Sequence, residues 1–145
     1  MRASTLGMKL TSIGTIHNSV CEPRPHGWES VESQIELQPD LIAGLDGIDG
    51  FSHLIVLFWL HLVPEDKRVA GPQDDWPVAA TFATRTPLRP NPIGMTVVEF
   101  LGRKGGVLRV RGLDAIDGTP VLDIKPYLPP YDARPDAKMP DWVHG

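Results

Sequence analysis

The chain has 145 residues, of which 41% are hydrophobic and 22% charged, and this predicts one globular domain with its own hydrophobic core. Its only cysteine, Cys21, excludes an internal disulfide and a metal site built on thiolates, and such cysteine usage is typical of the cytosol. The net charge of −4 differs from that of bulk nucleic-acid binders, which are usually basic, and the longest apolar run, 54–60, is too short to span a membrane.

Short strands are predicted along most of the chain. The segments with β-rich composition or apolar alternation are, in chain order, residues 9–16, 31–37, 53–63, 78–84, 95–101, 107–113 and 121–124. The run at 53–63 is continuously apolar and predicts a central strand that is buried on both faces. Turns recur at the short spacing typical of barrels and sandwiches, so we predict a mainly β fold rather than a Rossmann-type alternation of strands and helices.

The segments between these strands carry loop and turn signals. Prolines and a glycine predict a loop at 18–28, and polar residues predict another loop at 64–77. The pair Pro39-Asp40 suits the start of a short helix over 39–45. Two glycine-containing turns predict hairpins: Gly105-Gly106 and Asp117-Gly118.

The stretch 83–94, Ala-Thr-Arg-Thr-Pro-Leu-Arg-Pro-Asn-Pro-Ile-Gly, places prolines and arginines between apolar segments. Proline fixes its own φ, lacks a backbone donor and pushes the preceding residue out of the helical region, so this stretch predicts a stiff loop. Arg85 and Arg89 on such a loop suit the binding of an anion or a base plane with little loss of entropy. They also suit a rigid surface turn with two solvated arginines, and residue types alone leave both interpretations open.

Two histidines bracket the apolar run. His53 and His61 are eight residues apart, so on one strand they would lie roughly 26 Å from each other. They cannot share one metal ion, and no metal site is predicted. Each suits a structural role, whereas His61, at the point where a buried strand emerges, also lies where binding sites are common.

Two groups of charged residues are further candidates. Asp123, Lys125 and Tyr127 alternate near the end of a strand and share one face, which suits either a functional cluster or a surface salt bridge. A local basic patch is indicated by cations that occur within nine residues holding no acid: Arg103, Lys104, Arg109 and Arg111.

Several parts of the sequence together resemble one known family. They are Ile13-Gly14, Phe51-Ser52-His53 with the run to His61, residues 83–94, and residues 117–127, Asp-Gly-Thr-Pro-Val-Leu-Asp-Ile-Lys-Pro-Tyr. Their order and spacing are similar to those of the TsaA-like family, whose characterised members are the TrmO tRNA methyltransferases. We therefore expect residues 9–128 to form the family's domain, with a loose leader at 1–8 and an extended tail at 129–145.

The resemblance implies a small antiparallel β-barrel with short helices that binds S-adenosylmethionine without a Rossmann fold and works as a homodimer. It implies methylation of N6 of N6-threonylcarbamoyladenosine at position 37 of tRNA, beside the anticodon, in the cytoplasm. A tRNA enzyme needs a positive strip toward the methyl donor, for which Arg89 and the basic patch are candidates. Two other functions stay open: an S-adenosylmethionine-binding regulatory module, whose arginines would point elsewhere, and a methyltransferase acting on a small molecule.

The resemblance also implies site residues, although it identifies no catalytic one. Matching the family's cofactor-binding positions onto this chain gives His26, Gly27, Trp28, His61, Leu62, Arg85, Met95, Gly112, Leu113 and Asp114. An aspartate suits the cofactor's ribose hydroxyls or ammonium, an arginine its carboxylate, and a tryptophan or histidine the adenine face. As candidate substrate-binding residues we add, from their chemistry, Arg89, Asn91, Asp123, Lys125 and Tyr127.

Overall fold

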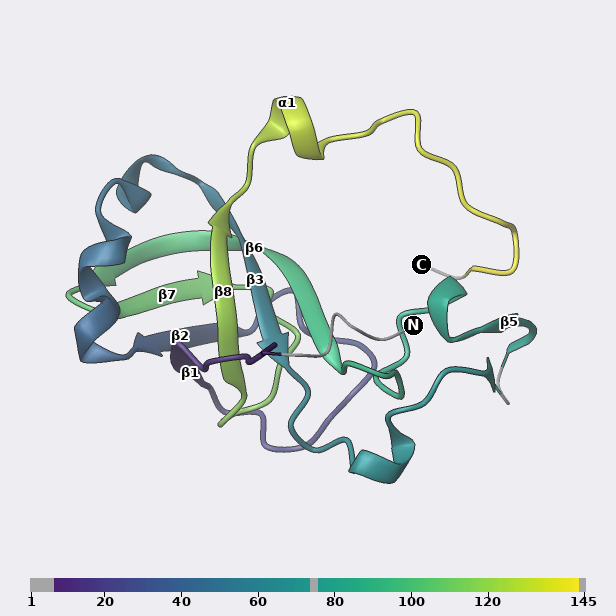
Figure 1. Ribbon diagram of the computed structural model, residues 1–145. Coiled ribbons are helices and arrows are strands. Elements are labelled where there is room, and N and C mark those ends of the chain that lie inside the picture. The colour runs from purple at the N-terminus through teal and green to yellow at the C-terminus, as the bar shows by residue number, and fades with distance from the viewer. Residues whose placement is uncertain (1–6, 74–75, 144–145) are drawn as a thin grey trace.

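A closed antiparallel barrel is the main feature of the chain in a computed structural model that describes residues 7–73 and 76–143 (Figure 1). Around the barrel the strands follow the order β1-β2-β7-β6-β3-β8. Their bounds are β1 Gly14–His17, β2 Glu32–Leu37, β3 His53–Trp59, β6 Ile93–Lys104, β7 Val107–Arg111 and β8 Pro120–Pro126. The predicted mainly β fold and the small antiparallel barrel implied by the resemblance are confirmed.

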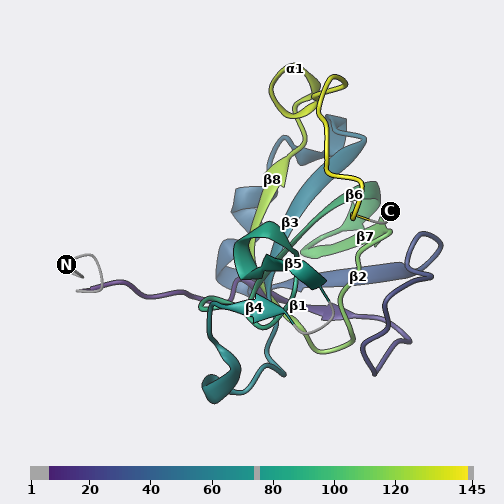
Figure 2. The same ribbon diagram turned by 90° about the vertical axis from the view of Figure 1, so that its right-hand side faces the viewer.

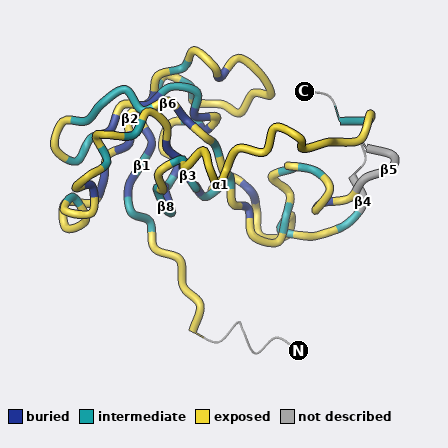
Figure 3. Tube along the Cα trace, turned by 90° about the horizontal axis from the view of Figure 1, so that it is seen from above, coloured by how far each residue is buried: buried dark blue, intermediate teal, exposed yellow. Residues whose placement is uncertain are grey.

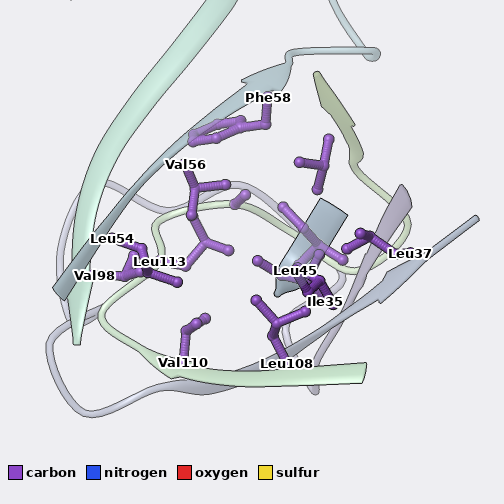
Figure 4. Close-up of a cluster of buried hydrophobic side chains, with 13 residues drawn as sticks. Ile35, Leu37, Leu45, Leu54, Val56, Phe58, Val98, Leu108, Val110 and Leu113 are labelled. Atoms are coloured by element: carbon purple, nitrogen blue, oxygen red, sulfur yellow. The ribbon is translucent and has the colours of Figure 1, made fainter. Parts of the chain in front are cut away.

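Alternation of side chains along the strands builds the core. On β2, Ile35 and Leu37 are buried, whereas Glu32, Gln34 and Glu36 on the other face are exposed. The corresponding residues of the other strands also point inward, and Figure 4 shows them gathered inside the barrel. Figure 3 shows most buried residues in the barrel, with single buried positions such as Trp28, Val63 and Thr81 in otherwise exposed loops. Because side chains in a strand alternate with a period of two, each strand supplies both the core and the outer surface.

The central strand is shorter and less buried than predicted. β3 ends at Trp59, and the Leu60 amide makes one further bond across to the Pro92 carbonyl, at 2.8 Å, before the chain leaves the barrel. Ile55, Leu57 and Trp59 are half-buried on the outer face, so the prediction of burial on both faces was wrong. In a barrel only the inner face of a strand meets the core, however apolar the sequence is.

Strand ends elsewhere also differ from the predictions. The first strand begins at Gly14 rather than at residue 9, because residues 9–12 run past the ladder and lie mostly exposed. The predicted strand at 78–84 ends at Ala80 as β5 (Trp76–Ala80) and is followed by the 3₁₀ helix η5 (Thr81–Ala83). The short helix predicted over 39–45 is confirmed, in the tighter 3₁₀ form, as η2 (Pro39–Leu45), followed by η3 (Ile48–Gly50).

The two predicted hairpin turns have different outcomes. Gly105-Gly106 joins the neighbouring strands β6 and β7, with Gly105 at a φ of 61°, so this hairpin is confirmed. Asp117-Gly118 is a turn but not a hairpin, because β7 pairs with β2 and β6 whereas β8 pairs with β1 and β3. The connection between β7 and β8 instead carries Leu113 into the core before β8 begins. Burial of this connection overrides the local hairpin signal.

Residues 60–92, called here the excursion, leave the barrel between β3 and β6 (Figure 1, Figure 2). Its elements are η4 (Glu65–Lys67), the two-stranded sheet of β4 (Pro72–Gln73) and β5, and η5. The prediction of one polar loop over 64–77 was therefore wrong in part, and residues 74–75 lie outside the described residues. The Arg68 guanidinium lies 5.2 Å from the ring centroid of Trp59, which ties the excursion to the barrel wall.

The C-terminal segment leaves β8 through a short helix, α1 (Pro129–Asp132), and then runs on without a ladder partner (Figure 1). Residues 133–141 are exposed throughout. Among the described residues, no helix is long and apolar enough to cross a membrane.

Candidate functional site

Two adjoining cavities lie at the barrel end where β3 ends and β6 begins. The first, called here the apolar cavity, has a volume of about 280 Å³ and is walled by Trp28, residues 60–64 and the β7–β8 connection. The second, called here the arginine cavity, has a volume of about 320 Å³ and is walled by residues 85–89 and the first residues of β6. Leu60, Pro87 and Asp114 line both cavities. The two therefore adjoin at a shared wall and make up the apolar half and the cationic half of one candidate site.

Asp114 stands on the wall between the two halves. Its side chain is exposed and its Oδ1 accepts a short hydrogen bond from the hydroxyl of Thr96 on β6. It is the one acid among the described residues that line either cavity. A carboxylate held in this way can accept hydrogen bonds from hydroxyl or ammonium groups of a ligand that spans both halves.

The two arginines of the predicted stiff loop have different roles. The Nη1 of Arg89 donates to the Thr84 carbonyl at 3.1 Å and to the Thr86 carbonyl at 3.0 Å, so Arg89 holds the loop together from within. Arg85 is exposed, lines the arginine cavity and makes no hydrogen bond or ion pair with the described part of the chain. Arg85 is therefore available to an anion. Asn91, a third candidate, is exposed and lines neither cavity.

The loop at 18–28 contributes one of its three implied residues to the cavities. Trp28 is buried, lines the apolar cavity, and donates from its indole nitrogen to the Arg24 carbonyl at 2.9 Å. The Arg24 guanidinium covers the indole at 4.9 Å from the ring centroid. His26 and Gly27 are exposed and outside both cavities, and Gly27 turns the chain with a φ of 87°. The loop thus fixes Trp28, and of its other implied residues Gly27 makes the turn.

Residues just beyond β3 reach the site because the strand ends before them. His61 and Leu62 are exposed and line the apolar cavity, and Leu62 has 59% of its surface accessible. Met95 on β6 lines the arginine cavity. Had β3 continued to Val63 as predicted, His61 and Leu62 would be in a ladder instead of at the mouth of a cavity.

Gly112 and Leu113 do not line the cavities, although the resemblance implies them beside Asp114. Leu113 is fully buried in the core, and the Gly112 amide donates to the Val31 carbonyl at 3.0 Å. Gly112 has a φ of 91°, a conformation that glycine adopts readily. These two residues position the aspartate and present no side chain to a ligand.

The candidates on β8 lie away from the cavities. Asp123 and Lys125 form a surface salt bridge at 3.1 Å, and Tyr127 packs edge-on against His53 with the ring centroids 6.4 Å apart. Thr119, just before β8, lines the apolar cavity, so Lys125 lies roughly 20 Å from it along the strand. The surface-salt-bridge interpretation is the one that the geometry supports.

The three arginines of the basic patch are paired with acids from other elements, whereas Lys104 is exposed and has no ion pair among the described residues. Arg103 pairs with Asp49 at 3.3 Å, and Arg109 pairs with Glu32 at 3.6 Å. Arg111 lies between Glu99 at 2.7 Å and Glu32 at 3.7 Å. This patch also lies at the far end of β6, and Arg103 is about 33 Å along the strand from Ile93 at the cavity. The described residues therefore provide no positive strip from the patch to the cavities.

Sequence reasoning missed Thr96, Pro87 and Leu60 as site residues. Thr96 lies opposite the buried Val56 in the β3–β6 ladder, so its side chain is on the inner face. A polar residue at an inward position of a strand is a signal that could have identified it. Pro87 was noted only as a cause of stiffness, and Leu60 was assigned to the buried strand. Both became wall residues only because the chain turns back at 60 and at 92.

Comparisons with known proteins agree on one family. Residues 7–133 match the tRNA-methyltransferase O N-terminal domain. A probable S-adenosyl-L-methionine-binding protein of Pyrococcus abyssi is 39% identical over 132 residues, which cover 88% of this chain and 72% of that protein. The human tRNA (adenine(37)-N6)-methyltransferase is 38% identical over 99 residues, which cover 66% of this chain and 22% of that protein.

Among solved structures, the crystal structure of TrmO from Pseudomonas aeruginosa matches with a TM-score of 0.72 and 36% sequence identity. The match covers 92% of this chain and 62% of that one. The chain thus spans about three fifths of the solved protein and about a fifth of the human enzyme.

Proposed function

Since this chain belongs to the family of the tRNA-methyltransferase O N-terminal domain, we propose that it is an S-adenosylmethionine-dependent methyltransferase. Its proposed reaction is methylation of N6 of N6-threonylcarbamoyladenosine at position 37 of tRNA. The observation that carries the proposal is the pair of adjoining cavities at the barrel end, one apolar and one with an unpaired arginine, which share Asp114 on their walls. The relatives named as S-adenosyl-L-methionine-binding proteins support the same cofactor.

The residues present fit the cofactor. An adenine suits the apolar cavity, whose wall includes Trp28 and His61, because aromatic faces stack on bases. Asp114 suits the ribose hydroxyls or the ammonium, and Arg85, which has no partner in the described part of the chain, suits the carboxylate. The two volumes together fall in the range of sites for ligands of this size.

The chain's own contribution to methyl transfer is placement. The bound cofactor would supply a methyl group activated by a sulfonium, and displacement at such a carbon depends on alignment and on exclusion of water. The loop at 84–89 is held by the bonds from Arg89, so Arg85 is presented on a rigid support.

A homodimer is part of the proposal, and one outer face of the barrel supports it. On β3 and β6, cross-strand neighbours form apolar pairs on the outside: Ile55 with Val97, Leu57 with Met95, and Trp59 with Ile93. The three β6 residues are 40–51% exposed. A second copy on this face would remove these side chains from water. Since Ile93 and Met95 also line the arginine cavity, the partner would lie beside the site.

The test is transfer of a labelled methyl group from S-adenosylmethionine to bulk tRNA, compared with tRNA that lacks the threonylcarbamoyl group. We expect incorporation only into the modified tRNA. Absence of incorporation into either tRNA would contradict the proposal, whereas incorporation into both would reassign the substrate to unmodified adenine.

One observation favours a second candidate, an S-adenosylmethionine-binding regulatory module. Arg103, Arg109 and Arg111 are paired with acids and so do not lead an RNA toward the cavities. This candidate predicts that the protein binds the cofactor in calorimetry but transfers no methyl group to tRNA or to small acceptor molecules.

A further inference from the structure

An exposed aromatic side chain stands beside the site without a role in it. Phe82, on η5, has 77% of its surface accessible, more than any other large hydrophobic side chain among the described residues. In Figure 1, η5 is the short helix directly after β5, on the excursion and away from the barrel core. Single exposed hydrophobic side chains are common on protein surfaces, so the case for Phe82 as a contact rests on its fixed backbone and its place beside the site.

The backbone that carries Phe82 is anchored on both sides. The hydroxyl of Thr81, a buried residue, accepts from the Gly71 amide at 3.0 Å, and the Thr81 amide donates to the Gly71 carbonyl at 3.0 Å. On the other side, the Thr84 amide and hydroxyl both donate to the Thr81 carbonyl, at 3.2 and 3.1 Å. Phe82 is therefore held outward by a fixed turn.

Phe82 is also close to the arginine cavity. It precedes Arg85 by three residues, so the two Cα atoms are at most about 11 Å apart. Arg85 and Arg89 line that cavity, against the single carboxylate of Asp114 among its described wall residues. An anchored aromatic ring beside a substrate cavity is a surface on which proteins stack unpaired bases of single-stranded nucleic acid.

We propose that Phe82 is a stacking platform for an unpaired base of the tRNA anticodon loop, next to the nucleotide whose N6 enters the site. This inference rests on the proposed function, and it names a substrate contact for it. Stacking on a phenyl ring tolerates every base, so Phe82 contributes affinity and orientation and does not select the sequence. It also gives the protein an RNA contact that does not need the basic patch.

The test uses an RNA hairpin with an anticodon stem-loop sequence in which 2-aminopurine replaces a loop base, because stacking quenches its fluorescence. Wild-type protein should bind the hairpin and quench the probe. In Phe82→Ala the quench should disappear and the Kd should rise about tenfold, whereas Phe82→Trp should restore both. Val69→Ala, which shortens another exposed apolar side chain of the excursion, is the matched control and should behave as wild type. S-adenosylmethionine affinity, measured by calorimetry, should be the same in all variants.

Each other outcome overturns a stated claim. An unchanged Kd and quench in Phe82→Ala, or no binding of the hairpin by the wild type, overturns the stacking role. Conversion of a dimer to monomers by Phe82→Ala, seen in sedimentation, also overturns it, because Phe82 would then be covered by a second copy. Wild-type protein that quenches the probe but methylates no tRNA overturns the proposed reaction alone. Methylation of tRNA with the same KM in wild type and Phe82→Ala overturns the stacking role alone.

Discussion

The two arginine-bearing regions of this protein differ in what their charges meet. In the loop at 84–89, Arg85 lines a cavity and has no partner in the described part of the chain. In the patch on β6 and β7, Arg109 and Arg111 lie within 4 Å of acids on neighbouring strands. The two regions are similarly cationic in sequence, yet of their arginines only Arg85 has no partner among the described residues.

The difference follows from how each region folds. In the patch, the antiparallel ladder places Glu32 and Glu99 directly opposite Arg111. The strand register itself therefore brings acids next to this arginine. In the loop, prolines prevent a ladder, and Arg89 uses the backbone of its own loop while Arg85 is left outside. A cation on a paired strand is thus readily neutralised, and one on a stiff loop can be kept for a ligand.

The largest expected effect is a loss of affinity for the cofactor when Arg85, the free arginine, is replaced. Arg85→Ala should reduce the affinity for S-adenosylmethionine about a hundredfold, or abolish it, because a charged pair with two hydrogen bonds contributes about 3 kcal/mol. Titration calorimetry measures it, and Arg109→Ala is the control from the patch, expected within twofold of wild type. Equal affinities for S-adenosylmethionine in the two variants would contradict the claim that the loop, and not the patch, binds the cofactor.

The next effect concerns the glycine that brings β6 past the core at the cavity end. A Cβ on Gly94 would lie 2.2 Å from the ring of Phe58, so Gly94→Ala should lower the free energy of unfolding by about 2 kcal/mol. Gly44→Ala is the matched control, since a Cβ there meets nothing within 4 Å. Urea denaturation compares the two variants. If Gly94→Ala were as stable as Gly44→Ala, the ring of Phe58 would have to move aside at little cost.

A smaller effect should separate the two arginines of the loop. Arg89→Ala removes two hydrogen bonds to backbone carbonyls and should cost about 1–2 kcal/mol of stability in chemical denaturation. Arg85→Ala should leave stability within about 0.5 kcal/mol of wild type, because it breaks no bond within the described chain. The opposite order of stabilities would reverse the two roles.

The smallest effect on stability should come from the patch. Glu32→Gln removes a carboxylate that serves both Arg109 and Arg111, and exposed pairs of this kind contribute less than about 1 kcal/mol. The same change frees Arg109, whereas Arg111 keeps Glu99 at 2.7 Å, so RNA binding at low salt should strengthen slightly and without sequence preference. Filter binding over a salt series measures it, and unchanged binding would indicate that Arg109 finds another acid.

Several features of the fold were predictable because they are local. Alternation with a period of two identified β2 and its inward face, and Gly105-Gly106 specified a hairpin. Proline chemistry alone predicted the loop at 83–94, although its ends are in regular elements: Ala83 ends η5, and Ile93 and Gly94 begin β6. The strand ends were not predictable, since residues 9–12 and 60–63 have strand composition but no partner strand.

Single residues of the candidate site could be predicted from the sequence, but the site as a whole could not. The resemblance pointed to Trp28, His61, Arg85 and Asp114, all of which line the cavities, but also to Leu113, which is buried. Position in a motif cannot separate a residue that meets a ligand from a neighbour that holds the backbone. The exposure of Phe82 likewise could not be predicted from the sequence, because most phenylalanines are buried in a core.

The sequence by itself determined the class of fold, the stiff loop and the family, since periodicity, turn residues and motif spacing are properties of neighbouring positions. Only the tertiary structure decided which charges are free and where the cavities lie. Closing the barrel brings Leu60, Pro87 and Asp114 to one wall and sets Arg111 between two acids. Those relations join residues far apart in the chain, and they exist only once the strands have paired.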